Sequence, residues 1–467
     1  MSEGPAHQPN AAPLPLAWRF WVVVLLVGVG AGVAGGLLTL LLHAVQDVAY
    51  GYRGESFQLG VEQAPAWRRV VVLALAGLVG GLGWWWLRGP VGRRLGRARG
   101  VAAAVWDPEG RMGLTRTLLD GVLQIVVVAL GASLGREGAP REVAAALASR
   151  LAELTGLSAE ERRVLIACGA GAGLAAVYDV PFGGGLFTLE VLLGTLALPV
   201  AVPAVVTSVL GAVTAWLFLG DTPVYAAGAP PVSAPVVVFA VVTAPVVALA
   251  GVGFVRLVAW SRRRVPTGWR LPVATTVVFA ALGALAIPLP ALLGNGKGPA
   301  QTVLDGGGTL PVLVALALLK PLATAASLRS GANGGLFTPT LATGALLGAV
   351  LGRFATLLGA GAPAGAYALV GAAAFLAAAQ QAPLSTVVLL LELTHVGTGL
   401  LVPIALAAVL AVLVARFVEP WSTTTAGLEG PSVTAPGPPV PSSSGRRRWR
   451  RARGRRPAPP PHRPARG

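Results

Sequence analysis

Charged residues are scarce in this chain: Lys, Arg, Asp and Glu make up 12% of its 467 residues, whereas 54% are hydrophobic. Uninterrupted apolar runs recur along nearly the whole length. This pattern excludes an ordinary soluble globule and predicts an integral membrane protein built from helices.

Cysteine is almost absent. Cys168 is the only one, so an internal disulfide is excluded, and its Gly- and Ala-rich surroundings predict an inert packing residue. No Cys or second His lies at metal-ligand spacing from His395, which predicts an interfacial or capping role for that histidine. We expect no metal, no other cofactor and no enzymatic activity.

Lysine is nearly missing as well, since only Lys297 and Lys320 are present, and the net charge of +17 rests on arginine. Ten arginines lie in Arg446–Arg466, after the last acidic residue. Residues 426–467 are predicted to be a disordered, basic, Pro/Arg-rich cytoplasmic tail that touches anionic lipid. A nucleic-acid arm is the less favoured interpretation, because the excess of Arg, Ala, Gly and Pro fits a GC-rich coding sequence.

The apolar runs differ in length. Some, such as Phe182–Leu219, exceed the roughly 20 residues that a helix needs to cross a membrane, and others are shorter. Interruptions by Gly and Pro predict broken and re-entrant helices around a protein-lined pathway. The first run, Trp21–His43, is too long for a secretory signal and is predicted to be a retained span after a cytoplasmic segment at 1–19.

An internal repeat organises the apolar part. Leu174–Glu190 aligns with Leu376–Glu392 at an offset of 202, with six identities that include a Pro and a Glu nine residues apart in both copies. The Gly-Arg-Glu-Gly-Ala-Pro motif that ends at Pro140 aligns with Gly335–Pro339 at an offset of 199. We therefore predict two halves, about 20–225 and 235–420, inverted relative to one another with a site between them.

The aligned motifs predict an anion site. In each, glycines precede a proline and a helix-forming run, so the positive ends of two helices would face the pathway. The first motif also carries Arg136 and Glu137, although a charge at membrane depth costs roughly 2.5–3.5 kcal/mol. A carboxylate there could occupy the anion position and leave when protonated, which would be a gate. The alternative is that these glycines only let helices pack closely.

Several motifs together resemble the CLC chloride channels and chloride/proton antiporters. They are Gly135-Arg-Glu-Gly, Gly334-Gly-Leu-Phe-Thr-Pro339, the Ala167–Ala176 run with Pro181 and Glu190, Gly294–Gly298, and Pro383–Thr394. The resemblance covers about residues 20–425. It implies an all-α inverted-repeat membrane fold, a homodimer with one pore in each subunit, and a multi-pass plasma-membrane protein with both termini cytoplasmic.

The resemblance also implies roles for particular residues. Glu137 would be the gating glutamate, and the anion would be bound by Gly135, Arg136, Gly138, Gly335 and the backbone amides of Leu336 and Phe337. Trp421 falls where the family usually has a tyrosine that touches the ion. The family's first anion loop should lie near Gly96–Gly100, but its Ser, Pro and Glu are absent there, and Ala139 replaces a proline that has moved to Pro140.

Val191 is the departure that bears on mechanism. Antiporters of the family usually carry two consecutive glutamates where this chain has Glu190-Val191, and the second relays protons. Because valine cannot carry a proton, the sequence favours a passive channel for chloride or another small anion. The alternative in the same class is a chloride or fluoride/proton antiporter. From another class, the alternative is a membrane-anchored protein that binds lipid or nucleic acid through its tail.

Four remaining residues are predicted to be structural. Glu190 and Glu392 are symmetric in the repeat and are expected to bond to backbone rather than to the ion. Tyr178 and Asp179 are expected to form the turn before Pro181.

Overall fold

The computed structural model describes residues 18–51, 56–96, 100–107, 110–228, 232–419 and 422. Within these residues, seven helical segments are long and apolar enough to cross a membrane. They are α1 (Trp18–Tyr50), α3 (Ala66–Arg88), α10 (Leu198–Leu219), α11 (Ala234–Arg263), α14 (Leu310–Ser330), α15 (Phe337–Leu357) and Thr398–Val418, which contains α18 (Leu401–Val418). The predicted all-α membrane fold is confirmed.

The other α-helices cover a wide range of lengths. They are α2 (Phe57–Gln63), α4 (Pro90–Arg94), α5 (Val101–Trp106), α6 (Leu114–Ala129), α7 (Gly138–Leu154), α8 (Ala159–Tyr178), α9 (Pro181–Phe187), α12 (Arg270–Leu285), α13 (Lys297–Leu304), α16 (Ala364–Gln380) and α17 (Pro383–Thr394).

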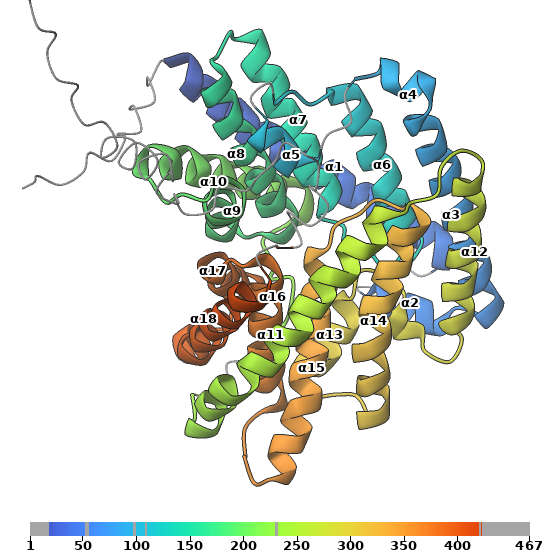
Figure 1. The fold of residues 1–467 in the computed structure, drawn as a ribbon, viewed down its shortest axis with the longest axis vertical. Coiled ribbons are helices and arrows are strands. Elements are labelled where there is room, and N and C mark those ends of the chain that lie inside the picture. Colours follow the sequence, from blue (N-terminus) through green and yellow to red (C-terminus); the bar gives the residue numbers. More distant parts are fainter. Residues whose placement is uncertain are drawn as a thin grey trace, which may run out of the picture. The chain divides into compact units, whose positions relative to one another are not determined.

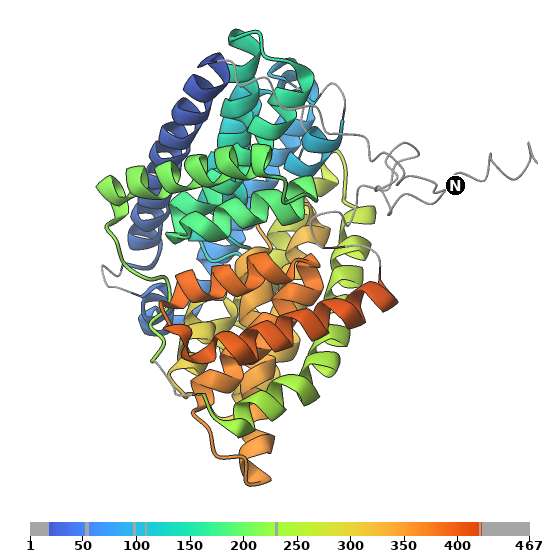
Figure 2. The same cartoon turned by 90° about the vertical axis from the view of Figure 1, so that its left-hand side faces the viewer.

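The helix packing repeats along the chain. In the first half α8 packs against α1, α7 and α10, and in the second half α16 packs against α11, α15 and α18. Figure 2 shows the blue-to-green helices of the first half beside the orange-to-red helices of the second (Figures 1 and 2). The duplication is therefore visible in the fold, whereas the domain limits 1–19, 20–425 and 426–467 stay predictions.

One segment predicted as a single span is interrupted. The apolar run Phe182–Leu219 forms α9, a π-helical segment Thr188–Leu193 and then α10. The break lies at Gly194, whose φ of 66° is a left-handed conformation that glycine adopts without steric cost and that ends helices. The prediction of broken helices is confirmed, because α7 and α15 also begin at buried positions inside the protein.

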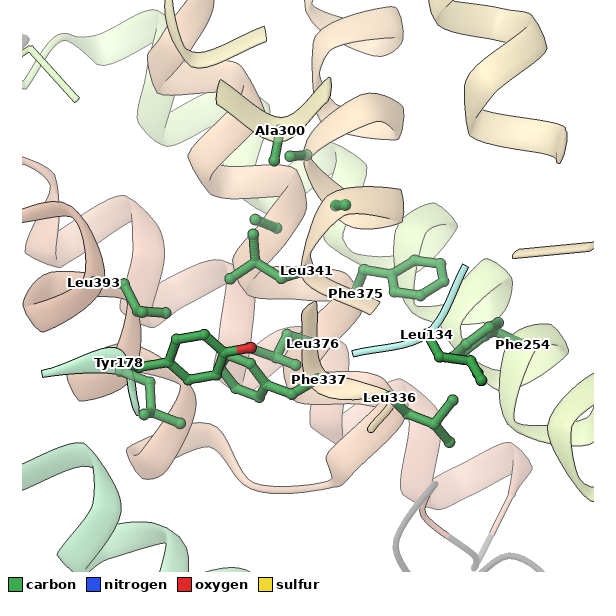
Figure 3. Packing of buried hydrophobic residues seen from close by; sticks show 14 of the residues in the cluster. Leu134, Tyr178, Phe254, Ala300, Leu336, Phe337, Leu341, Phe375, Leu376 and Leu393 are labelled. Carbon is green, nitrogen blue, oxygen red and sulfur yellow. The ribbon is translucent and has the colours of Figure 1, made fainter. Parts of the chain in front are cut away.

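Small side chains place α8 and α16 in the interior of their halves. Nearly every residue of α16 is buried, and most of them are Ala or Gly. A methyl group at Gly348 of α15 would lie 2.8 Å from the Cα of Gly371 in α16, so the two backbones approach closely there. Phe337 and Leu341 of α15 and Phe375 and Leu376 of α16 belong to one buried apolar cluster (Figure 3). The start of α15 is thereby fixed inside the protein.

Candidate functional site

The two aligned motifs meet through their backbones. The N–H of Gly135 donates to the carbonyl oxygen of Gly335 at 2.7 Å, and the N–H of Gly335 donates to that of Gly135 at 2.9 Å. These reciprocal bonds join segments that lie 200 residues apart in the chain. The starts of α7 and α15 are therefore held beside one another.

Glu137 lies fully buried at this junction. Its Oε1 accepts a hydrogen bond from the backbone N–H of Phe337 at 2.6 Å, at the first turn of α15. Its Oε2 accepts one from the Tyr178 hydroxyl at 2.8 Å and one from the Thr338 hydroxyl at 3.3 Å. Bonds to an ionised acceptor are strong, and the helix start favours negative charge, so this position is built to hold an anionic group.

The positions of the glycines around Glu137 leave no space for a side chain. A Cβ atom at Gly135 or at Gly335 would overlap the Glu137 carboxyl group. A Cβ atom at Gly138 would lie 2.8 Å from the Gln124 Oε1 and from the backbone nitrogen of Gly335. Any larger residue at these three positions would displace the carboxylate or separate the two loops.

Arg136 and Phe337 surround the same position. The Arg136 guanidinium lies 5.3 Å from the centre of the Tyr178 ring and donates to the carbonyl oxygen of Val177 at 3.2 Å. The rings of Tyr178 and Phe337 are 5.7 Å apart, and Leu336 precedes Phe337 as the buried cap of α15 (Figure 3). The predicted site residues are thus brought together, except Trp421, which lies outside the described residues.

Tyr178 was interpreted wrongly from the sequence. It is the last residue of α8, and its hydroxyl points into the site, where it also hydrogen-bonds to the Thr338 hydroxyl. Only Asp179 has the turn conformation, with a φ of 53°. Two features of the sequence could have indicated this role. Tyr178 carries a hydroxyl group at the end of an apolar run rich in Gly and Ala, and Thr338 places a second hydroxyl group inside the second motif.

Glu190 and Glu392 cap helices of the opposite repeat. Glu190 accepts hydrogen bonds from the N–H groups of Leu384 and Ser385, at 3.2 and 2.7 Å, in the first turn of α17. Glu392 accepts bonds from the N–H groups of Phe182 and Gly183, at 3.0 and 2.7 Å, in the first turn of α9. Both helices begin with proline, which leaves these amides as the free donors.

This reciprocal capping leads to a stability prediction. Glu190→Gln and Glu392→Gln each replace a carboxylate oxygen by an N–H donor that faces backbone donors, so each should lower the free energy of unfolding by about 1–3 kcal/mol. Thermal unfolding of the detergent-solubilised protein measures the effect. Glu160→Gln, at an exposed carboxylate in the first turn of α8, is the matched control and should lower the midpoint less than either variant, because it loses only the interaction with the helix dipole. Equal midpoints for all three variants would contradict the capping interpretation.

Val191 and the predicted first anion loop contribute no charge near Glu137 within the described residues. Val191 is partly buried and packs against the apolar core, and Ala139 is buried in the first turn of α7. His395 ends α17 with a φ of 46°, in a capping position. Arg97, Ala98 and Arg99 of the predicted loop lie outside the described residues.

The chain is similar to known proteins over most of its length. The family model described as "Voltage gated chloride channel" matches residues 80–416. The chain is 32% identical to the voltage-gated ClC-type chloride channel ClcB of Citrobacter koseri, over 74% of this chain and 84% of that protein. It is 30% identical to the protein of the same name from Salmonella typhimurium, over 84% of this chain and 96% of that protein.

Solved structures share the fold. A slow cyanobacterial Cl⁻/H⁺ antiporter superposes with a TM-score of 0.75 at 21% identity, over 88% of this chain and 97% of that one. A CLC-type fluoride/proton antiporter superposes with a TM-score of 0.71 at 20% identity, over 88% of this chain and 98% of that one.

Proposed function

We propose a function for this chain on the basis that it belongs to the CLC family of voltage-gated chloride channels. The protein exchanges a small anion, such as chloride or fluoride, for protons across a membrane. The Glu137 carboxylate and the transported anion would take turns at one position. Each departure of the carboxylate would require a proton, and each return would release it.

One observation supports this proposal above all. The buried Glu137 carboxylate already uses the donors that a dehydrated anion would need, namely the Phe337 amide and the Tyr178 and Thr338 hydroxyls. A charged carboxylate cannot leave these donors for an apolar interior without a large desolvation cost. Protonation removes the charge, so entry of the anion is linked to uptake of a proton.

The proposal replaces the passive channel that the sequence favoured. That prediction rested on Val191, and the absence of one carboxylate does not exclude another proton route. The similar solved structures are a Cl⁻/H⁺ and a fluoride/proton antiporter, and at 21% and 20% identity they support a shared fold. The passive channel stays the second candidate, because Val191 is apolar and the curated relatives are named channels.

Electrical recording separates the two candidates. The protein in a planar bilayer, with equal chloride on both sides and a pH gradient, should show a zero-current potential displaced from zero, since protons and anions move together. A channel would hold that potential at the Nernst potential of the anion, which is zero in this arrangement, and that result would contradict exchange.

A homodimer in the plasma membrane, with one pathway per subunit and both termini cytoplasmic, belongs to the same proposal and rests on the family. The lipid- or nucleic-acid-binding alternative depends on the tail, which lies outside the described residues. Truncation after Gly430 should leave anion flux in liposomes unchanged and weaken only binding to anionic lipid. Loss of flux in a folded truncated protein would instead assign the tail a part in transport.

A further inference from the structure

A water-accessible cavity lies beside the site, among α3, α6 and the loop that precedes α15. Its volume is about 190 Å³, which holds several water molecules. Its lining includes Asp120 of α6, Glu142 of α7 and Asn333, which precedes the Gly334-Gly335 pair. Figure 1 shows α6 between α7 and α3, and the cavity reaches α7 at Glu142, in the second turn of the helix whose N-cap is Glu137.

Gln124 connects this cavity to the site. Its side-chain N–H groups donate to Asp120 Oδ2 at 2.7 Å and to Glu142 Oε2 at 2.9 Å, so one buried amide bridges the two carboxylates. Its Oε1 lies beside Gly138, where a Cβ atom would be 2.8 Å from it. Gly138 directly follows Glu137. Gln124 therefore lies between the two cavity carboxylates and the residue that follows Glu137.

The two carboxylates are not equivalent. Asp120 Oδ1 also accepts hydrogen bonds from the indole N–H of Trp84 at 2.8 Å and from the Asn333 amide at 3.3 Å. For Glu142 the structure gives one hydrogen bond, from Gln124. Desolvation, and after it the neighbouring Asp120 carboxylate, disfavours a negative charge on Glu142, so Glu142 is the member to which a proton is assigned.

The cations around the pair do not neutralise it by contact. Arg88 donates to the carbonyl oxygen of Gly331 and to the Asn333 side chain, and Arg116 donates to the carbonyl oxygens of Gly92 and Gly96. Arg141 and Arg262 act on Glu142 electrostatically, but the ion pairs formed within the described part of the chain do not include Asp120 or Glu142. Proton exchange with cavity water is thus open to the pair.

We infer that Glu142, paired with Asp120 through Gln124, is the proton relay on the cavity side of Glu137, in place of the missing carboxylate at Val191. This inference rests on the proposed exchange function. A proton from cavity water binds a Glu142 carboxylate oxygen, that O–H bond then breaks, and the proton passes to the Glu137 carboxylate through water as Glu137 leaves the Phe337 amide. No electrons are transferred, and Gln124 acts as a positioning residue.

The experiment measures chloride flux and chloride-driven proton uptake in the same liposomes, with the full-length protein. Glu142→Gln should lower proton uptake at least about tenfold and keep chloride flux within about twofold of the original, because the relay carries protons but does not touch the anion. Glu142→Asp retains a carboxyl group and should restore part of the uptake. Glu153→Gln, on the exposed end of the same helix, is the matched control and should change neither quantity.

The outcomes separate the two claims. If the original protein and Glu142→Gln drive proton uptake equally, the relay assignment is wrong and the exchange function stands. If the original protein drives none, the exchange function and the relay fall together. If Glu142→Gln loses chloride flux as well, Glu142→Asp decides: a variant that recovers flux but no proton uptake shows a structural role and overturns the relay.

Discussion

Replacing Glu137 by glutamine should leave chloride flux that no longer depends on pH and no longer moves protons. The unaltered protein is closed while the carboxylate is held by the Phe337 amide, so its flux should rise as the external pH is lowered through the range tested. Glutamine carries no charge at any pH and cannot bind a proton reversibly. Its flux should therefore equal or exceed that of the unaltered protein and stay constant across this range.

Efflux of chloride from liposomes at a series of external pH values measures the effect. Glu153→Gln, a carboxylate of the same helix that pairs with Arg111 and Arg150 at the protein surface, should retain the original pH profile. A folded Glu137→Gln protein without flux, or one with the original pH profile, would count against Glu137 as the gate.

Gly335→Ala should lower chloride flux about tenfold, because overpacking of a filled site costs about 1–3 kcal/mol and 1.4 kcal/mol corresponds to a factor of ten. The methyl group would overlap the position of the Glu137 carboxyl group. We propose that the anion uses that same position, so the loss should persist in the double variant Glu137→Ala/Gly335→Ala. Isotopic chloride uptake into liposomes is the measurement.

The double variant makes this prediction specific. If the added methyl group disturbed only the Glu137 side chain, removal of that side chain would restore flux to the level of Glu137→Ala, and the shared position would be wrong. Gly253→Ala is the matched control, since a Cβ atom at Gly253 in α11 meets no atom within 4 Å. Its flux should equal that of the original protein.

The sequence predicted the features that repeat or that violate the apolar pattern. Glu137 stands out because a charge is rare in such surroundings, and the spacing of Pro181 and Glu190, repeated at Pro383 and Glu392, indicated the duplication. Backbone pairing of Gly135 with Gly335 follows from that symmetry, although the sequence gives no distance between the two loops.

The sequence could not predict contacts that join unrelated positions. Tyr178 lies 41 residues from Glu137, and nothing in its neighbourhood shows that the end of α8 points toward the start of α15. Glu142 likewise resembles an ordinary polar residue until Gln124 and Asp120, from another helix, are placed beside it. The break at Gly194 was missed because hydrophobicity continues through it, and only the backbone conformation ends the helix.

The central claim, exchange of anions for protons, is tested most directly by a chloride gradient alone. Liposomes that contain the protein and a high chloride concentration are diluted into low chloride at equal pH and equal K⁺, with a potassium ionophore to carry the compensating charge, and the external pH is recorded. We predict that outward chloride flow drives protons into the liposomes, so the external pH rises until the gradient is spent. Chloride efflux with no change of the external pH would contradict the account and leave a passive channel.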